Sequence, residues 1–236
     1  MLENHVKNKI MKRQLSVAYM LCGLLFTVCL IVANIVEQKT IALGKIEATA
    51  GLLIFPVSYI VNDLISEVWG YRKARLIIWS GFLMNFLAVA IFQLSIHVPG
   101  SVNFHHQEAF SQVLGNTLRL TLASFIAFLC GSFLNAFVMS KMKLRHGGRR
   151  FSLRAIVSTL AGEGVDSLIF FSIAFTGILP PSDLLMLMLT QTGMKTAYEI
   201  LVLPLTSKIV VYLKKVEKVE VFDRDISYNP FKITDL

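Results

Sequence analysis

The sequence predicts an all-α fold, a polytopic membrane bundle of six transmembrane helices with both termini in the cytoplasm. Of its 236 residues, 55% are hydrophobic and only 16% are charged, and the mean hydropathy is +0.64. Such a chain is too apolar for an ordinary soluble domain. It also contains six long apolar runs, and its basic residues gather in alternate loops.

Each apolar run has about the length of 20 residues that a spanning helix needs. The first run follows a basic stretch, but its apolar core, Ser16 to Val36, is longer than that of a signal peptide, so we expect a retained helix. With no internal repeat and no long linker, residues 1–236 are predicted to form one membrane domain with short basic tails. The predicted helices cover about residues 15–36, 48–67, 76–97, 118–140, 155–179 and 184–213.

The basic residues predict the orientation. They are Lys7, Lys9, Lys12 and Arg13 before the first run, Arg72, Lys73 and Arg75 after the second, Lys141, Lys143, Arg145, Arg149, Arg150 and Arg154 after the fourth, and Lys214, Lys215, Lys218, Arg224 and Lys232 after the sixth. The other loops hold only Lys39 and Lys45. The positive-inside rule places both termini in the cytoplasm, which requires an even number of spans. This topology accounts for the net charge of +8, so no nucleic-acid partner is needed.

Three of the runs carry ionisable residues, which are costly inside a bilayer and therefore point to function. Their spacings of three and four place each set on one helix face. The sets are Asp63 and Glu67 in the second run, Glu163 and Asp166 in the fifth, and Gln191, Lys195 and Glu199 in the sixth. We expect these polar stripes to face the bundle interior or a water-filled cavity.

Each set also has a structural interpretation. Glu67 lies close to Arg72, Lys73 and Arg75 in the sequence, so it can belong to an interfacial ion pair. Lys195 and Glu199 can pair across one helical turn. Asp166 has no basic residue on its own helix nearer than Arg154, so either its partner comes from another helix or it is protonated.

The five acids in these sets exceed the two bases within or beside the spans, Lys195 and Arg119. Some acids must then lie at the aqueous boundary, carry a proton, or await a cationic or proton-donating ligand.

An intramembrane enzyme is the rival class. The chain has neither an H-E-x-x-H zinc motif nor a G-x-S-x-G nucleophile elbow. The stretch GEGVDS resembles a phosphate loop only loosely, and Asp63 and Asp166 lack the glycine spacing of an aspartyl protease. The three histidines near loop 98–117, His97, His105 and His106, are interpreted as solvated. We therefore expect a carrier of a small polar solute, with no enzymatic activity, cofactor or metal.

Several motifs identify a family resemblance that runs from the first span to about residue 213. The stretches ANIVEQK, FPVSYIVNDLISEVWGYRKAR, STLAGEGVDSLIFFSIAF and MKTAYEI occur in that order. They resemble the queuosine-precursor transporters, also called vitamin-uptake-transporter-like proteins of bacteria. The resemblance implies a multi-pass carrier of the bacterial inner membrane that imports 7-deazaguanine bases, chiefly 7-cyano-7-deazaguanine. The alternatives are 7-aminomethyl-7-deazaguanine and queuine.

The resemblance also implies the substrate-binding residues. They are Asn34 in the first helix, Asp63 and Glu67 in the second, Arg119 in the fourth, Asp166 in the fifth, and Lys195 with Glu199 in the sixth. Glu163, at a variable position of the family, joins them because of its place in the stripe of the fifth run. We expect the site near the middle of the bilayer between the second, fifth and sixth helices, and transport by alternating access.

A guanine-type edge suits such residues. It presents two adjacent N–H donors to a carboxylate, and its carbonyl oxygen suits a Lys, Arg or Asn donor. The candidates for stacking on the flat ring are Phe55, Tyr59, Trp69, Phe170 and Tyr198. The alternative role is the substrate-binding subunit of an ATP-driven vitamin importer, and because the chain has no nucleotide-binding loop, a partner would use the ATP. The sequence leaves open a homodimer or partner subunits, the coupling ion and the exact deazapurine.

Overall fold

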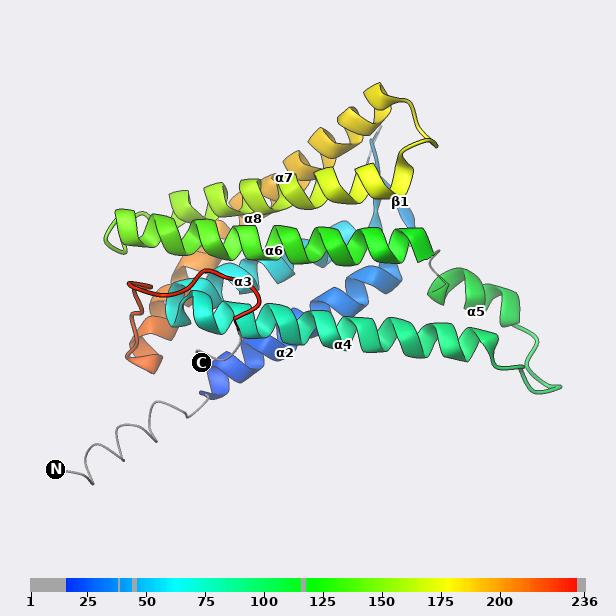
Figure 1. Ribbon diagram of the computed structural model, residues 1–236, viewed down its shortest axis with the longest axis horizontal. Coiled ribbons are helices and arrows are strands. Elements are labelled where there is room, and N and C mark those ends of the chain that lie inside the picture. The colour runs from blue at the N-terminus through cyan, green and yellow to red at the C-terminus, as the bar shows by residue number, and fades with distance from the viewer. Residues whose placement is uncertain (1–15, 38, 44–45, 116–117, 233–236) are drawn as a thin grey trace.

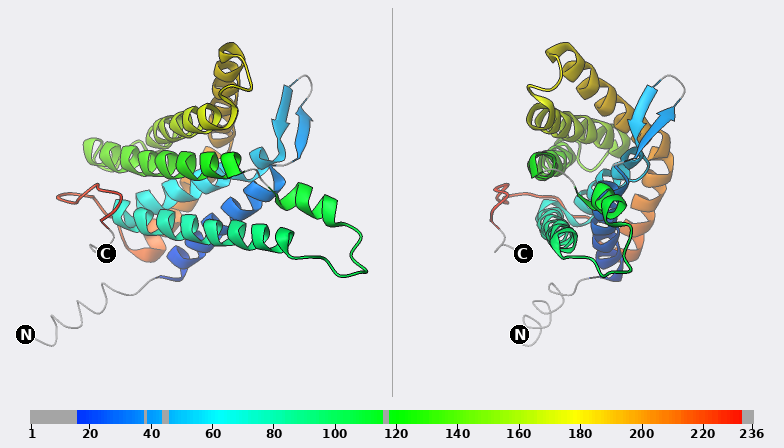
Figure 2. Two further views of the ribbon diagram at one scale, coloured as in Figure 1. Left: turned by 45° about the vertical axis from the view of Figure 1, so that its right-hand side comes forward. Right: turned by 90° about the vertical axis from the view of Figure 1, so that its right-hand side faces the viewer.

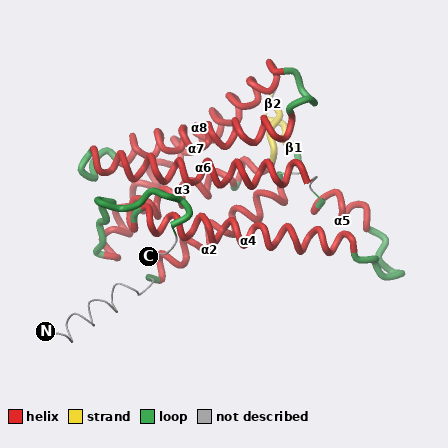
Figure 3. The backbone as a smooth tube through the Cα atoms, in the orientation of Figure 1, coloured by secondary structure: helices red, strands yellow, loops and turns green. Residues whose placement is uncertain are grey.

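A computed structural model describes residues 16–37, 39–43, 46–115 and 118–232, and most of the described chain is helical (Figure 3). Six helices are long and apolar enough to cross a membrane, which confirms the predicted all-α fold with six spans. They are α2 (Val17–Val36), α3 (Phe55–Trp69, preceded by the 3-10 turn η1, Ala50–Leu53), α4 (Tyr71–His97), α6 (Leu118–Arg145), α7 (Phe151–Phe175) and α8 (Pro181–Glu217).

The two ends of the bundle differ (Figure 1). At one end, which we call the tail end, α2 begins and α8 finishes. The opposite end, the hairpin end, carries two elements that the hydropathy pattern did not predict: an antiparallel hairpin and a short helix, α5. The hairpin projects from the bundle (Figure 2). These elements are β1 (Thr40–Leu43), β2 (Ile46–Thr49), in the register Thr40↔Thr49, and α5 (Gln107–Leu114), which lies in the segment expected to be a solvated loop.

Several helices extend past the apolar runs that predicted them. The third span, α4, begins at Tyr71 and not at 76, so the basic residues Arg72, Lys73 and Arg75 lie in its first turns and not in a loop. Likewise α7 begins at Phe151, and α8 runs from Pro181 to Glu217. Backbone hydrogen bonding continues into the basic ends, which hydropathy does not detect. The basic stretch from Lys7 to Arg13, the residue at 15 where the first helix was expected to begin, and Lys45 lie outside the described residues.

Helix α3 is the centre of the bundle. Every residue from Ser58 to Trp69 is buried, although the stretch contains Asn62, Asp63 and Glu67. By contrast, α2 exposes large apolar residues along one face, as expected for a helix that contacts lipid tails. The polar stripe predicted on α3 therefore faces protein, where polar partners offset the cost of leaving water.

Helices α6 and α7 approach each other closely at two glycines. A Cβ on Gly162 would lie 2.8 Å from both the Asn135 Cβ and the Gly131 carbonyl oxygen. Small residues of this kind allow close helix packing in membranes. This approach places the polar residues of α7 directly beside α3 and α6.

The segment 219–232 folds back over the tail end instead of extending into solvent (Figure 1). Asp223 accepts hydrogen bonds from the Tyr71 amide at 2.9 Å and the Ser140 hydroxyl at 2.5 Å. Arg75 donates to the Asn229 carbonyl at 2.8 Å, and Trp79 donates to the Pro230 carbonyl at 2.8 Å. These bonds tie the tail segment to α4 and α6.

A Gly70→Ala variant should melt at a lower temperature than the native protein in detergent. Gly70, between α3 and α4, has φ +83°, and an added Cβ would lie 2.7 Å from Asp223 Oδ1 and 2.8 Å from Val221 Cγ1. The left-handed backbone alone costs a non-glycine residue about 1–2 kcal/mol. Gly164→Ala is the control, because Gly164 is helical with open space around its Cβ position. Equal melting of the two variants would show that the tail segment does not constrain this turn.

Candidate functional site

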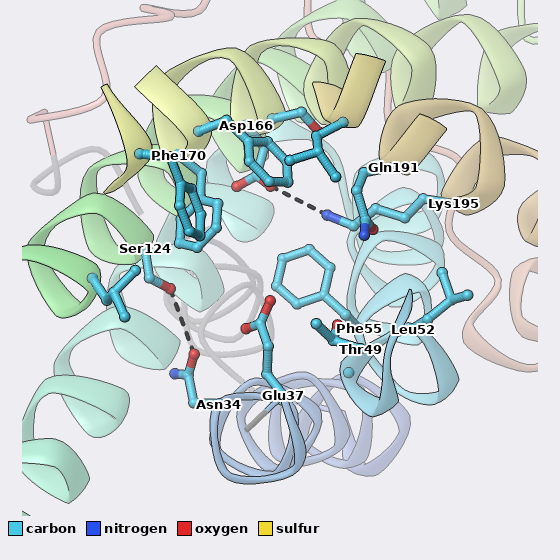
Figure 4. Close-up of a pocket in the computed structure, with 16 residues that line it drawn as sticks. Asn34, Glu37, Thr49, Leu52, Phe55, Ser124, Asp166, Phe170, Gln191 and Lys195 are labelled. Atoms are coloured by element: carbon cyan, nitrogen blue, oxygen red, sulfur yellow. Dashed lines mark hydrogen bonds and ion pairs between the residues drawn. The ribbon is translucent and has the colours of Figure 1, made fainter. Parts of the chain in front are cut away.

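A cavity of about 310 Å³ lies among the helices, and Thr49 of the hairpin is part of its lining (Figure 4). Its volume is near the lower limit for small-molecule sites, which is about 300 Å³. Residues from α2, the hairpin, α3, α6, α7 and α8 meet here. The lining consists of Asn34, Glu37, Thr49, Gly51, Leu52, Phe55, Leu120, Ser124, Asp166, Ser167, Phe170, Phe171, Phe175, Leu187, Gln191 and Lys195.

Lys195 organises one wall of the cavity. Its ammonium group lies 2.8 Å from Glu163 Oε2 and 3.3 Å from Asp166 Oδ2, and 4.1 Å from the centre of the Phe55 ring. The pairing therefore runs between α8 and α7, and not along α8 to Glu199 as the sequence allowed. Of the two alternatives for Asp166, the structure shows a partner from another helix. Asp166 and Lys195 line the cavity, while Glu163 is fully buried behind them.

Glu37 supplies a carboxylate from the opposite wall. It follows the last turn of α2, and its carboxylate points into the cavity toward Phe55 (Figure 4). Burial raises the pKa of this carboxyl, with Lys195 opposing that effect. Sequence reasoning missed Glu37 because it lies at the boundary of the first apolar run. The only signal for it was its place in the stretch ANIVEQK.

Aromatic rings form the apolar walls. Phe55 and Phe170, two of the five predicted stacking residues, line the cavity together with Phe171 and Phe175. Of the other three predicted stacking residues, Trp69 and Tyr198 pack in the hydrophobic core. Tyr59 is buried beside Phe55, with the two ring centres 5.8 Å apart, and does not line the cavity. The cavity therefore combines flat apolar walls with acidic groups and one ammonium, which suits a planar polar ligand.

Asn34 lies at the α2 side of the same cavity. Its amide nitrogen donates to Asn85 Oδ1 at 2.8 Å, and the Ser124 hydroxyl lies 3.5 Å from Asn34 Oδ1. These contacts fix the orientation of an amide that also borders the cavity.

Asp63 and Glu199 lie outside the lining, deeper in the bundle. Both side chains are buried, with exposed fractions of 0% and 2%, and the two carboxyl groups are in hydrogen-bonding contact. Asp63 Oδ1 also accepts from Asn135 at 3.0 Å and from Ser158 at 3.2 Å. The pair forms a layer between the cavity and the tail end.

Glu67 is the acid of an ion cluster at the tail end. Arg154 binds its two carboxylate oxygens at 2.5 and 3.1 Å, Lys214 lies at 2.6 Å, and Lys143 lies at 3.8 Å. Its partners are therefore residues of α6, α7 and α8, and not the neighbouring Arg72, Lys73 and Arg75. The cluster binds four helices together, and Glu67 does not reach the cavity.

Arg119 likewise lies away from the cavity lining. Its guanidinium donates to the carbonyls of Ile173 at 2.5 Å and Thr176 at 2.6 Å, at the end of α7. A cation bound to the last carbonyls of a helix stabilises that end. Among the described residues, no group of three His, Cys, Asp or Glu side chains is arranged to hold a metal ion.

Comparison with known proteins agrees with the resemblance. Residues 49–209 match the family described as "Putative vitamin uptake transporter". No solved structure matches the chain. A "Probable queuosine precursor transporter" of Bacillus subtilis (strain 168) is 28% identical over 180 residues, which are 75% of this chain and 77% of the relative.

Two further relatives carry similar names. The "Queuosine precursor transporter" of Escherichia coli (strain K12) is 27% identical over 61% of this chain, and the "Probable queuosine precursor transporter" of Haemophilus influenzae is 27% identical over 59% of it. The alignments span 62% and 59% of the lengths of these two relatives. The names confirm the prediction of a multi-pass membrane transporter and not an enzyme. Since the matching family covers most of the chain, this protein belongs to the "Putative vitamin uptake transporter" family.

Proposed function

We propose that this protein imports a queuosine precursor of the guanine-type 7-deazapurine class, 7-cyano-7-deazaguanine in the first place, across the bacterial cytoplasmic membrane. The observation that carries the proposal is a cavity of molecular size with carboxylates, an ammonium group and phenylalanine rings, in a chain whose relatives are named queuosine precursor transporters.

The chemistry of the lining matches that of the base. A guanine-type edge offers two adjacent N–H donors, and one carboxylate accepts both in a bidentate manner. Glu37 and Asp166 are the carboxylates of the cavity, and Lys195 and Asn34 are donors for the carbonyl oxygen. Phe55 and Phe170 supply faces for the ring. Glu163 contributes by holding Lys195 in place.

The proposed direction follows from charge. The basic ends of α4, α6 and α8 lie at the tail end, which the positive-inside rule places in the cytoplasm. The cavity then opens toward the outside, where the precursor is captured. The layer of Asp63 and Glu199 and the Glu67 cluster close the path to the cytoplasm. In alternating access, this closed side opens after the cavity has closed.

Restoration of queuosine tests the proposal. In a bacterium that neither synthesises deazapurines nor carries its own transporter, the native chain should restore queuosine in tRNA at nanomolar 7-cyano-7-deazaguanine. Asp166→Asn, inserted at the same level, should restore far less, because Lys195 loses one of its two acids. Glu108→Gln on α5 is the control, since this exposed side chain lies outside the lining.

Parallel cultures with 7-aminomethyl-7-deazaguanine and queuine identify the substrate. The compound that restores queuosine at the lowest concentration is the preferred one. If the well-expressed native chain fails with all three compounds, a stand-alone deazapurine importer is excluded, and the remaining reading is a binding subunit that needs an ATP-using partner.

A further inference from the structure

The contact between Asp63 and Glu199 poses an electrostatic problem that the substrate cavity does not solve. Two carboxyl groups from α3 and α8 touch each other in the interior, and both are almost completely buried. An isolated charge at such a place costs several kcal/mol, and two adjacent carboxylates cannot both be ionised. The pair must therefore be compensated by a cation or a proton.

The surrounding groups supply no cation. From α6, Asn135 donates to Asp63, and from α7, Ser158 donates to it and Thr159 lies beside Glu199. The nearest bases are already engaged: Lys195, one turn along α8, binds Glu163 and Asp166, and Arg154 and Lys214 bind Glu67. Within the described part of the chain, no Lys, Arg or His forms an ion pair with either carboxyl.

The hydrogen bonds around the pair are satisfied by one proton that Asp63 and Glu199 share. Asp63 accepts from the Asn135 amide at 3.0 Å, and the Ser158 hydroxyl lies 3.2 Å from Asp63 Oδ1 while it also contacts the Ala155 carbonyl at 2.9 Å. Oε2 of Glu199 receives no hydrogen bond from the described residues. A protonated Glu199 that donates to Asp63 satisfies both groups. A bridging metal ion would separate the carboxyl oxygens, whereas a shared proton holds them in the contact that is observed.

We propose that the Asp63–Glu199 pair is a proton-binding site that couples deazapurine import to proton entry, an inference that rests on the proposed function. With the proton bound, the layer carries one charge held by hydrogen bonds, and it can stay dry and closed. Loss of the proton leaves two adjacent carboxylates, which require water. Release of the proton therefore favours opening at the tail end, on the cytoplasmic side.

Proteoliposomes containing the purified full chain test the coupling. Native protein should accumulate 7-cyano-7-deazaguanine when the outside is acidic, up to about tenfold for one pH unit if one proton accompanies each substrate. A pH dye trapped inside should report proton entry that depends on the substrate. Glu199→Gln should abolish this accumulation but keep counterflow, the exchange of labelled for unlabelled substrate, because that exchange needs no net proton movement. Asp183→Asn, an exposed acid on the same helix, should behave as native.

The outcomes separate the two claims. Native protein that performs counterflow but does not accumulate substrate in response to the pH gradient, or that accumulates it only with a sodium gradient, overturns the proton coupling and leaves the import function intact. Accumulation by Glu199→Gln that equals native overturns it as well. Absence of native counterflow overturns the deazapurine function.

Infrared spectroscopy tests the bound proton independently of transport and of substrate identity. Native protein at neutral pH should show a protonated carboxyl band that Glu199→Gln lacks and Asp183→Asn keeps. If Glu199→Gln is not stable enough to purify, Asp63→Glu takes its place, and the band should then shift. A native spectrum that matches that of the variant overturns the proton site.

Discussion

Glu67→Gln is expected to destabilise the protein by about 3–5 kcal/mol, the usual consequence of removing one partner from a buried ion pair. Glu67 is fully buried and contacts Arg154, Lys214 and Lys143. A neutral amide would leave the buried Arg154 guanidinium without its acid, close to two ammonium groups. The change is measured by thermal unfolding in detergent, with the fraction of protein that stays monodisperse after heating as the readout.

Glu220→Gln is the matched control, because Glu220 pairs with the same Lys214 at 2.9 Å but is about half exposed. The hydrogen bond from Lys214 lowers the pKa of Glu220, yet an exposed pair of this kind contributes only about 0–1 kcal/mol. Both variants remove one acid from Lys214, but only Glu67→Gln also removes the acid that Arg154 and Lys143 contact, so their difference measures the buried part of the cluster. Similar unfolding temperatures for Glu67→Gln and Glu220→Gln would contradict the structural role of the cluster.

The sequence predicted the six spans because each depends on a local property, about 20 apolar residues between polar boundaries. It also placed Asp63, Asp166, Lys195 and Glu199 correctly in the interior, since a charged side chain deep in a span is costly in lipid and therefore faces the bundle. The elements that it missed do not follow from hydropathy. Helix α5 lies outside the apolar runs, and the β1–β2 hairpin overlaps them only at Ala48 and Thr49, where the predicted second helix was wrong and strand is found. The tail segment is positioned by contacts with Tyr71, Ser140 and Trp79 far away in the chain.

The division of roles among the polar residues depended on contacts between helices. Sequence spacing offered Lys195 a partner on its own helix, Glu199, but the structure pairs it with two acids of α7. Glu67 finds its cations at positions 143, 154 and 214, which no local pattern connects. Glu37 borders the cavity only because the end of α2 faces residues of α7 and α8 across it. These contacts depend on how the helices pack against one another. Helix packing cannot be predicted from the spacing of residues in a single sequence.

Glu37→Gln is expected to weaken binding of 7-cyano-7-deazaguanine by about 10- to 150-fold, since hydrogen bonds to a charged group contribute about 1.5–3 kcal/mol. The carboxylate points into the cavity, and no described side chain forms an ion pair with it. Its loss should therefore affect the ligand and not the fold. An amide also turns an N–H donor toward the donors of the guanine-type edge. Calorimetric titration of purified protein measures the change, with thermal unfolding as the check on folding.

Two further variants identify which carboxylate accepts the hydrogen bonds of the base. Glu108→Gln should bind as native, because Glu108 is exposed on α5 and outside the lining. Asp166→Asn should weaken binding through Lys195, whose ammonium would then be held by Glu163 alone. If Asp166→Asn abolishes binding while Glu37→Gln binds as native, then Asp166 accepts the two N–H groups of the base. Glu37 then makes no hydrogen bond with the bound base. If Glu37→Gln has the larger effect, the ligand lies against α2, and Lys195 then reaches its carbonyl from the opposite wall.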